Sequence, residues 1–314
     1  MGINFGNTPL VTIGIPVYNA EKFITATLNS VEQQVYPAIE LIVVNDGSTD
    51  NSFELIKTWA KSSKWPVTLL NHEKNKGLTA SCNALLHKAN GKYFQKLDAD
   101  DLIRPDKILT QVNVLEKSSC EVALVYGNVQ LINEDGLELE EEYYERIGST
   151  PLEGKGLYNA LLESNFVPNP AVLTRTRVLK EMGGYDATLL YEDWDMWLKI
   201  SRKYSFIYTP EKDSCYRISS NSMMMGPQNG AALNDTVFTM LKNQLNTGVP
   251  DENIIWNRLK MQAIYSFYTN GPAALSKLKW YYSRKKDLKI AFYYILALLR
   301  IRHPSAYLKR TKTK

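Results

Sequence analysis

The chain has 314 residues, of which 44% are hydrophobic, 22% are charged and 11% are aromatic. This composition is typical of a globular protein, and it excludes wholesale disorder and collagen-like structure. The length allows one large domain with an appendage, or two domains. The longest apolar run, Ile290–Leu299, would span about 15 Å as a helix, which is half of what crossing a bilayer requires.

The formal net charge of +4 is distributed unevenly along the chain. Residues 277–314 hold 12 of the 37 Lys and Arg residues and a single acid, Asp287, so this tail has a net charge of +11. The remaining residues, 1–276, therefore carry a net charge of −7. We expect any polyanion to meet the basic tail.

Cysteine usage and the N-terminal sequence both point to the cytoplasm. The three cysteines are widely separated and odd in number, which predicts neither a disulfide framework nor a Cys-x-x-Cys metal pair. The segment Met1–Thr8 lacks the basic and apolar regions of a signal peptide. We therefore expect a protein that works in a reducing compartment.

The first hundred residues alternate strand and helix patterns. Short runs rich in apolar and β-branched residues predict strands at Val11–Val17, Ile39–Val44, Val67–Leu70 and Tyr93–Leu97. Apolar residues at helical spacing predict a helix after each of the first three strands. Such βαβ units indicate a largely parallel sheet, in which ligands bind beyond the carboxyl ends of the strands.

Beyond the first hundred residues, the predicted secondary structure changes twice along the chain. A helix over 104–118, a strand at Val122–Ile132 and a helix over 193–203 are predicted, and the seven acids in 134–145 are interpreted as a solvated loop or hairpin. Beyond Gly226 the strand patterns fade. We therefore predict an α/β domain over residues 1–225 and a helical extension over 226–314.

Three groups of acids follow predicted strands or open a predicted helix. Asp98, Asp100 and Asp101 come directly after a buried strand, where their repulsion favours a divalent cation such as Mg²⁺, although a polar loop that caps the next helix is the alternative. Asp46 lies in an Asn-Asp-Gly-Ser turn, which fits either a simple Asx-turn or a contact with a nucleoside. Glu192-Asp193 opens a Trp-rich helix, and Asp193 is either its cap or a general base.

Several common catalytic motifs do not occur in the sequence. The three histidines show no metal-ligand spacing, and there is no G-x-S-x-G, no G-x-x-x-x-G-K-[ST] and no G-x-G-x-x-G. A nucleotide bound here would be held by carboxylates and a metal rather than by a glycine-rich phosphate loop.

Taken in order, the motifs resemble those of family 2 glycosyltransferases with the GT-A fold. The matching segments are Ile13–Glu21, Val43–Asp50, Asn75–Asn83, Leu97–Asp101 as the DxD motif, Gly183–Asp186 with Glu192–Asp195 as the ED block, and Tyr216-Arg217. They extend over residues 10–223, about two thirds of the chain. The resemblance implies a Rossmann-like, mostly parallel mixed sheet flanked by helices.

The resemblance also implies an activity and a role for each matching residue. It implies inverting transfer of a sugar, usually from a UDP-sugar, to a hydroxyl of a glycan or lipid-linked acceptor in cell-surface polysaccharide synthesis. Mn²⁺ or Mg²⁺ would be held by Asp100 and Asp98, and Asp193 would be the general base. The donor nucleotide would be bound by Pro16, Tyr18, Glu21, Asp46 and Asp98, and the acceptor side would be lined by Glu192, Trp194, Tyr216 and Arg217.

The sequence departs from the family pattern at two positions. Asn45 replaces an acid, so nucleoside recognition would rest on Asp46. Cys82 stands where many members carry arginine, which removes one expected contact with the diphosphate. There is also no Q-x-x-R-W motif, which argues against a processive polysaccharide synthase.

The basic tail interleaves bases with aromatic residues, as interfacial membrane anchors do. We expect residues 277–314 to bind an anionic membrane surface and to hold the protein at the cytoplasmic face of the membrane. Packing of Ile290–Leu299 on the body, or on a second subunit as an oligomer contact, is the alternative, and nucleic-acid binding is not expected. For the whole chain, the alternatives to an active transferase are a catalytically silent sugar-nucleotide-binding partner and a nucleotidyltransferase.

Overall fold

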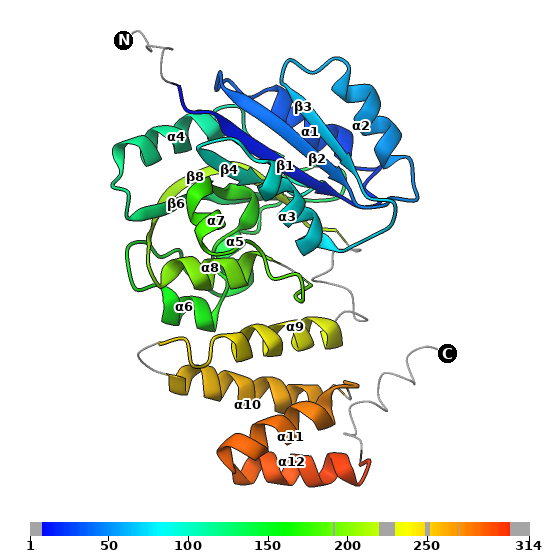
Figure 1. Cartoon of the computed structure of the whole chain (residues 1–314), viewed down its shortest axis with the longest axis vertical. Coiled ribbons are helices and arrows are strands. Elements are labelled where there is room, and N and C mark those ends of the chain that lie inside the picture. The colour runs from blue at the N-terminus through cyan, green and yellow to red at the C-terminus, as the bar shows by residue number, and fades with distance from the viewer. Residues whose placement is uncertain (1–7, 191, 220–229, 249–251, 270, 302–314) are drawn as a thin grey trace. The chain divides into compact units, whose positions relative to one another are not determined.

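The computed structural model describes residues 8–190, 192–219, 230–248, 252–269 and 271–301 (Figure 1). The chain divides into two compact units, Met1–Ser219 and Ser220–Lys314. The predicted boundary between residues 225 and 226 lies outside the described residues and stays a prediction. Each unit is described by itself below.

The first unit is built on one mixed sheet of eight strands in the order β3-β2-β1-β4-β7-β6-β8-β5. Strands β3, β2, β1 and β4 are mutually parallel, β7 is antiparallel to both of its neighbours, and β6 and β8 are parallel. This architecture confirms the predicted fold class. The strands are β1 (Val11–Val17), β2 (Ile39–Asn45), β3 (Val67–Asn71), β4 (Tyr93–Lys96), β5 (Leu102–Ile103), β6 (Val122–Ile132), β7 (Val172–Arg175) and β8 (Ser205–Arg217).

Helices connect the strands of this unit and cover both faces of the sheet (Figure 1). They are α1 (Ile24–Glu32), α2 (Ser52–Ala60), α3 (Leu78–Lys88), α4 (Lys107–Lys117), α5 (Tyr143–Ile147), α6 (Tyr158–Glu163), α7 (Thr176–Glu181) and α8 (Asp193–Ser201), with a short 3₁₀ turn at Asn169–Ala171. The acidic run over 134–145, predicted as a loop or hairpin, begins as a hairpin with one antiparallel bridge between Ile132 and Glu138, and its last residues enter α5.

The two faces of strand β1 pack against different layers of helices. Side chains alternate along a strand, and Ile13 and Ile15 are fully buried in a cluster with residues of α1, α2 and α4. Gly14 faces the other layer, where a β-carbon would lie 3.0 Å from the Phe94 ring and 3.3 Å from Cβ of Leu85 on α3. Every residue of β1 is buried, so this strand lies in the centre of the hydrophobic core.

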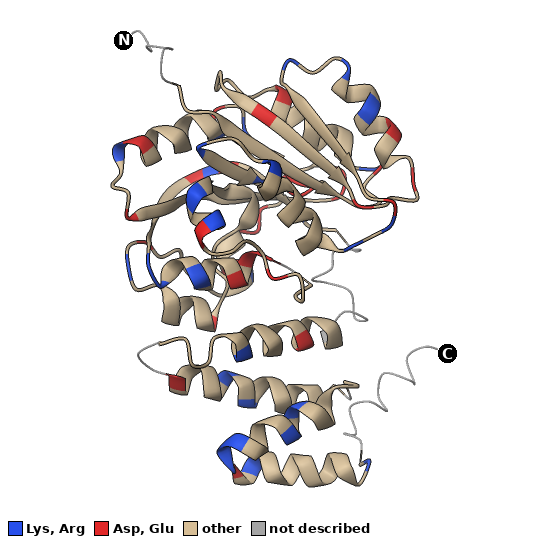
Figure 2. Ribbon diagram, viewed as in Figure 1, with Lys and Arg blue, Asp and Glu red and all other residues tan. Residues whose placement is uncertain are grey.

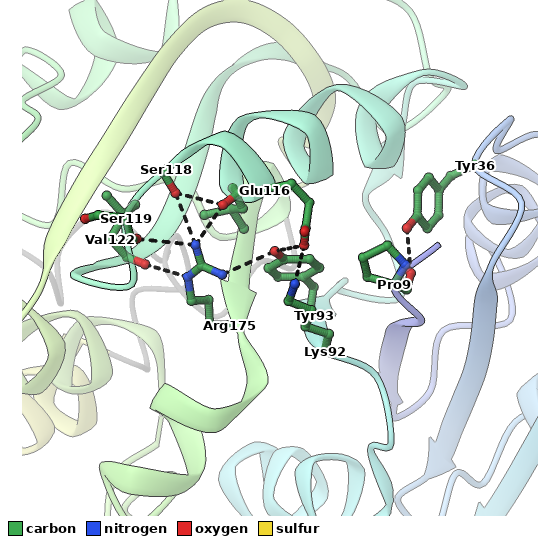
Figure 3. A network of polar contacts seen from close by, with 10 residues as sticks. Pro9, Tyr36, Lys92, Tyr93, Glu116, Ser118, Ser119, Val122 and Arg175 are labelled. Atoms are coloured by element: carbon green, nitrogen blue, oxygen red, sulfur yellow. Dashed lines mark hydrogen bonds and ion pairs between the residues drawn. The ribbon is translucent and has the colours of Figure 1, made fainter. Parts of the chain in front are cut away.

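The end of the sheet where β4 begins is fixed by a buried arginine (Figure 3). Arg175, 8% exposed at the end of β7, donates from Nε to the carbonyl of Val122 at 2.8 Å and from Nη2 to the carbonyl of Leu115 at 2.7 Å. Its Nη1 donates to the hydroxyl of Tyr93, which in turn contacts Glu116. This network joins β4, β6, β7 and the end of α4, and each arginine nitrogen has a partner.

The second unit is helical in its described residues, as predicted. Its helices are α9 (Gly230–Asn243), α10 (Glu252–Tyr268), α11 (Ala274–Lys285) and α12 (Leu288–Leu298). Helix α10 contacts each of the other three. Its buried residues Leu259 and Ala263, and Leu278 of α11, are completely inaccessible to solvent, so the four helices share one small core.

Candidate active site

Two loops at the carboxyl ends of β1 and β2 are held together by reciprocal hydrogen bonds. The Oδ1 of Asn19 accepts from the backbone N–H of Thr49 at 2.8 Å, and the N–H of Asn19 donates to Oγ of Ser48 at 3.1 Å. Glu21, predicted to bind the donor, accepts the N–H of Asn51 at 2.9 Å. The loops that follow the first two parallel strands therefore form one rigid rim.

Asp46 lies in the turn that follows β2 and is 3% exposed. Its Oδ1 contacts Nδ1 of His72 at 2.7 Å and accepts the N–H of Lys76 at 3.0 Å, and its Oδ2 accepts the N–H of Gly77 at 2.9 Å. The turn itself requires glycine at position 47, because φ is +69° and a β-carbon would lie 2.6 Å from backbone atoms of the 74–75 segment. Asp46 thus anchors the loop before α3, and a contact with a nucleoside stays a prediction.

Lys96, the last residue of β4, joins two acidic motifs that are far apart in the sequence. Its ammonium lies 2.5 Å from Oδ1 of Asp98 and 2.5 Å from Oε1 of Glu192, and the lysine side chain is 6% exposed. The second oxygen of Asp98 accepts a hydrogen bond from Nδ2 of Asn169 at 2.9 Å. The predicted DxD motif and the predicted ED block therefore form a single site around one buried cation.

Asp100 and Asp101 differ sharply in their surroundings. Asp101 is 2% exposed and accepts the backbone N–H of Arg217 at 2.9 Å, whereas the carboxylate of Asp100 receives no donor from any other residue in the described part of the chain. Burial, and then the charge of Asp98, raise the pKa of Asp100 to about 6. Arg217 donates from Nε to the carbonyl of Asp100 at 2.7 Å, which ties the end of β8 to this loop.

The donor set around Asp100 fits a divalent cation that arrives with its ligand. Among the described residues no group of three His, Cys, Asp or Glu side chains could hold a metal by itself. Mg²⁺ usually takes one or two carboxylates and completes its shell with water and substrate phosphate oxygens. An oxygen ligand without a protein partner, Asp100, beside an already engaged Asp98 is consistent with that mode.

Asp193 is the first residue of α8, as the sequence predicted. Its Oδ2 accepts from Nδ2 of Asn165 at 3.0 Å and its Oδ1 accepts the N–H of Trp194 at 2.7 Å. Burial raises the pKa of Asp193, although the nearby ammonium of Lys96 opposes the shift. Trp194 directs its indole N–H to the carbonyl of Leu161 at 2.6 Å, so it fixes α8 against α6.

Glu192 is almost completely enclosed, at 3% exposure. Burial raises its pKa to about 7, with the charge of Lys96 opposing and that of Asp193 reinforcing the rise. Its Oε1 is paired with Lys96, but its Oε2 is buried without a hydrogen-bond partner. Such an oxygen is costly to leave unpaired, and it fits a hydroxyl donor from a bound molecule.

The remaining residues that the sequence predicted for the site differ in their exposure to solvent. Pro16 is buried within β1, while Tyr18 is 51% exposed and presents its ring to solvent. The ring of Tyr216 packs edge-on against that of Tyr143, with 6.1 Å between centroids. Proximity to Asp98, Asp101 and Asp193 contributes to a raised pKa of Tyr216, after burial.

Sequence reasoning missed three residues of this site, Lys96, Asn165 and Asn169. Lys96 carried a readable signal, because a lysine within a buried strand, two residues before an acidic cluster, is expensive unless it is paired. Cys82, where family members often carry arginine, is fully buried, and its pKa is raised by burial and then by the charge of Glu192. The cation that this position lacks is present nearby as Lys96.

The α/β fold, with the DxD motif and the ED block joined through Lys96, is consistent with a nucleotide-sugar transferase. The family model "Glycosyl transferase family 2" matches residues 12–182. The chain therefore belongs to glycosyl transferase family 2, as its motifs predicted.

Relatives in sequence agree with this assignment. An uncharacterized glycosyltransferase of Haemophilus influenzae is 31% identical over 218 residues, which cover 68% of this chain and 67% of the relative. A second uncharacterized glycosyltransferase, from Rickettsia felis, is 31% identical over 195 residues, which cover 62% of this chain and 32% of the relative. The chain thus spans about a third of the length of that second relative.

Two solved structures share the fold at low identity. The mannosyltransferase PcManGT from Pyrobaculum calidifontis, in complex with GDP-Man and Mn²⁺, matches with a TM-score of 0.63 at 18% identity, covering 96% of this chain and 81% of the other. S. aureus TarS 1-349, in complex with UDP-GlcNAc, matches with a TM-score of 0.61 at 18% identity, covering 92% and 79%. Among the described helices of our chain, none has the length and apolar character needed to span a membrane.

Proposed function

We propose that the protein is an inverting, metal-dependent glycosyltransferase of the hexosyl or N-acetylhexosaminyl class. It would move a sugar from a nucleotide sugar, a UDP-sugar by preference, to a hydroxyl of a glycan or lipid-linked acceptor in cell-surface polysaccharide synthesis. The observation that carries the proposal is the contact of one buried ammonium, Lys96, with both Asp98 and Glu192. That contact brings together the residues that we propose for the donor side and for the acceptor side.

On the donor side, the rim formed by the loops after β1 and β2 would hold the nucleotide. Tyr18 offers an exposed ring for stacking on a base, beside Pro16, Glu21 and Asp46. Asp98, fixed by Lys96 and Asn169, is held ready to accept a hydroxyl of the nucleotide. The structural neighbours solved with GDP-Man and with UDP-GlcNAc support a nucleotide-sugar donor in general.

Asp100 would be the principal ligand of Mn²⁺ or Mg²⁺, with Asp98 beside it. When bound, such a cation neutralises the charge that develops on the diphosphate leaving group. Mn²⁺ in the PcManGT complex supports the use of a divalent metal. Arg217 would keep Asp100 in place through its hydrogen bond to the Asp100 carbonyl.

On the acceptor side, Asp193 would take the proton of the attacking hydroxyl. Two hydrogen bonds, from Asn165 and from the backbone of Trp194, orient its carboxylate, and burial makes it more basic than a surface aspartate. The unpaired Oε2 of Glu192 would accept a hydroxyl of the incoming sugar. A base opposite the leaving group gives a single displacement, which inverts the anomeric centre.

A catalytically silent partner of another transferase is the second candidate. It would bind a nucleotide sugar in the same way but would need no basic carboxylate on the acceptor side. The orientation of the Asp193 carboxylate by Asn165 and by the N–H of Trp194 is an observation against it, because a protein that only binds the donor has no use for a positioned base on the acceptor side.

The experiment is a transfer and hydrolysis assay with a panel of UDP- and GDP-sugars, Mn²⁺, and glycan and lipid-linked acceptors. Release of the nucleoside diphosphate identifies the donor, and NMR of the product reports its anomeric configuration. We expect one donor to be consumed with inversion. Retention of configuration would contradict the single-displacement mechanism, and binding of a donor without any turnover would favour the silent partner.

A further inference from the structure

Helix α12 exposes a continuous apolar face. Leu288, Phe292, Ile295 and Leu299, here called the α12 stripe, are 87%, 58%, 54% and 65% exposed. They recur at intervals of four, three and four residues, which places them on one side of a helix. Leu298, 54% exposed, widens the same face. Large aliphatic and aromatic side chains in such a contiguous row mark an interaction surface.

The opposite face of α12 is already occupied by its own unit. Ile290 is fully buried, and Tyr293, 9% exposed, contacts Phe267 and Tyr268 of α10. The N-terminus of α12 is capped by Asp287, which accepts the N–H of Ile290 at 3.1 Å. The helix is therefore held in place by one face, and the stripe is not needed for that packing.

Positive charge lies at both ends of α12. In the part of 277–301 that the structure describes, Asp287 is the only acid, and it is paired with Lys260 at 2.5 Å. Figure 2 shows the cluster of Lys and Arg at the α11–α12 turn and the uncharged length of α12 that follows. The exposed bases that flank the stripe in the sequence are Arg284, Lys285, Lys286, Lys289 and Arg300, of which the first three also lie over the rings of Trp280, Trp256 and Tyr282.

We propose that the α12 stripe and these five bases form a contact surface for an anionic lipid bilayer. In this arrangement α12 lies parallel to the membrane plane, the stripe enters the boundary between headgroups and acyl chains, and the bases meet the lipid phosphates. The stripe is about 16 Å long at 1.5 Å per residue, which suits a helix that lies on a membrane and does not cross it. The proposal assigns particular residues to the membrane contact that the sequence led us to expect for residues 277–314.

Charge also distinguishes a bilayer from a second copy of the chain. Two copies joined through this face would bring the same positive clusters together, and like charges at close range oppose association. An anionic lipid surface offers apolar chains for the stripe and negative headgroups for the bases at the same time. The bilayer is therefore the occupant that the charge pattern favours.

The test is flotation of the full chain with two kinds of vesicle. One kind contains phosphatidylcholine alone, and in the other about 30% of the lipid is the anionic phosphatidylglycerol. We expect binding to the anionic vesicles only, with roughly a fivefold loss for each base removed in Lys285→Gln and Lys289→Gln. The double variant Phe292→Gln/Leu299→Gln should lose tenfold or more, because its apolar area no longer leaves water. Raising the salt should weaken the wild type.

A matched control separates this surface from any exposed apolar residue. Val35 of the first unit is 57% exposed, and Val35→Gln should leave flotation unchanged. Because the stripe side chains are exposed, the melting temperature of the double variant should equal or exceed that of the wild type, which checks folding. Sugar transfer does not enter the assay, so this proposal and the proposed function can fail separately.

Three results would overturn the proposal. One is a wild type that does not float with anionic vesicles, and another is a double variant that floats as well as the wild type. The third is a light-scattering mass showing a dimer that the double variant converts to a monomer, without vesicle binding by either. That last outcome would assign the stripe to a second copy of the chain.

Discussion

The two ends of the first unit's sheet both bury charged side chains, but the partners of those side chains differ. Where β4 begins, the three nitrogens of Arg175 all find partners, from Val122, Leu115 and Tyr93 among others (Figure 3). Where β4 ends, a single lysine is paired with two carboxylates, and two further acids, Asp100 and Asp193, have raised pKa values.

The difference teaches where to look for chemistry. A buried charge whose hydrogen bonds are complete stabilises a fold and has no remaining capacity to bind a ligand. Carboxylates crowded together with too little positive charge are costly in the isolated protein, and that cost is relieved when a cation or a hydroxyl donor binds. The first end therefore supports the structure, and the second supports the proposed reaction. Four predictions test this contrast.

The largest effect is expected from Asp193→Asn. The amide preserves the shape and the hydrogen bond from Trp194, but it cannot take a proton, so kcat should fall by about 10²–10⁴. Binding of UDP and the melting temperature should stay close to those of the wild type. Asp195→Asn is the matched control, since Asp195 lies on the same helix but is paired with Lys199 at 2.7 Å. Equal rates for both variants would make Asp193 only a helix cap.

Removal of the shared cation is the next largest change. Lys96→Met leaves the buried Glu192 and the partly buried Asp98 without a counter-ion, which should cost about 3–5 kcal/mol of unfolding free energy at pH 7.5 in urea titrations. The deficit should shrink at pH 5, because a carboxylate that has lost its ammonium holds its proton in the folded state. Lys92→Met, at a half-exposed lysine paired with Glu116, should cost less than about 1 kcal/mol. Similar losses for both lysines would refute the special role of Lys96.

At the opposite end of the sheet, where β4 begins, we expect a substitution of Arg175 to lower stability and to leave transfer activity unchanged. Arg175→Met leaves the carbonyls of Val122 and Leu115 without their donors, at a cost of about 2–4 kcal/mol. Transfer activity per folded molecule should not change. Arg177→Met, at an exposed arginine that donates only to the carbonyl of Cys120, should have little effect on either quantity. A loss of turnover in folded Arg175→Met would break the division between the two ends.

The smallest effect concerns the pH dependence of stability. Asp213 is buried beside Gln111 and Ser214, and burial raises its pKa from 3.8 to about 6, although Lys107 opposes the rise. Between those values the folded state holds one more proton than the unfolded state, so stability should fall as pH rises. The contribution has a slope of at most about 1.4 kcal/mol per pH unit. Urea titrations from pH 4 to 6 should show that slope as the difference between wild type and Asp213→Asn, and no difference would mean that Asp213 titrates normally.

The parallel half of the sheet could be predicted from sequence because its signals are local. The bounds of β1 and β6 agree with their predicted ranges, and β2 and β3 each extend one residue further. Strand β8 could not be found in this way. Its residues include Glu211, Lys212 and Asp213, and they form a strand because β6 and β5 supply hydrogen-bonding edges on both sides. Such pairing is tertiary and leaves little trace in the pattern.

The candidate site also has features that the sequence reveals and features that only the fold reveals. The acids at positions 46, 100 and 193 stand in short motifs that a single sequence reveals. The motifs do not reveal which partners the acids have. Asp46 accepts hydrogen bonds from the N–H groups of Gly77 and Lys76, and Asp98 is paired with Lys96. The contacts of Asp46 join segments about thirty residues apart, and Lys96 also contacts Glu192, about a hundred residues further along the chain. In the tail, the apolar run was evident, but only the fold shows that Ile290 faces inward and Leu288 outward.

The most direct test of the account is calorimetry of UDP binding with Mn²⁺ and with EDTA, for the wild type, Asp100→Asn and the exposed control Asp106→Asn, with GDP as a second probe. Asp100 is the carboxylate that no other described residue supplies with a donor, so it should carry the metal-dependent part of binding. We predict that the wild type and Asp106→Asn bind UDP only with Mn²⁺, and that Asp100→Asn binds tenfold or more weakly. Equal affinity in EDTA, or an unchanged Asp100→Asn, would contradict the claim that this end of the sheet binds a metal–nucleotide complex.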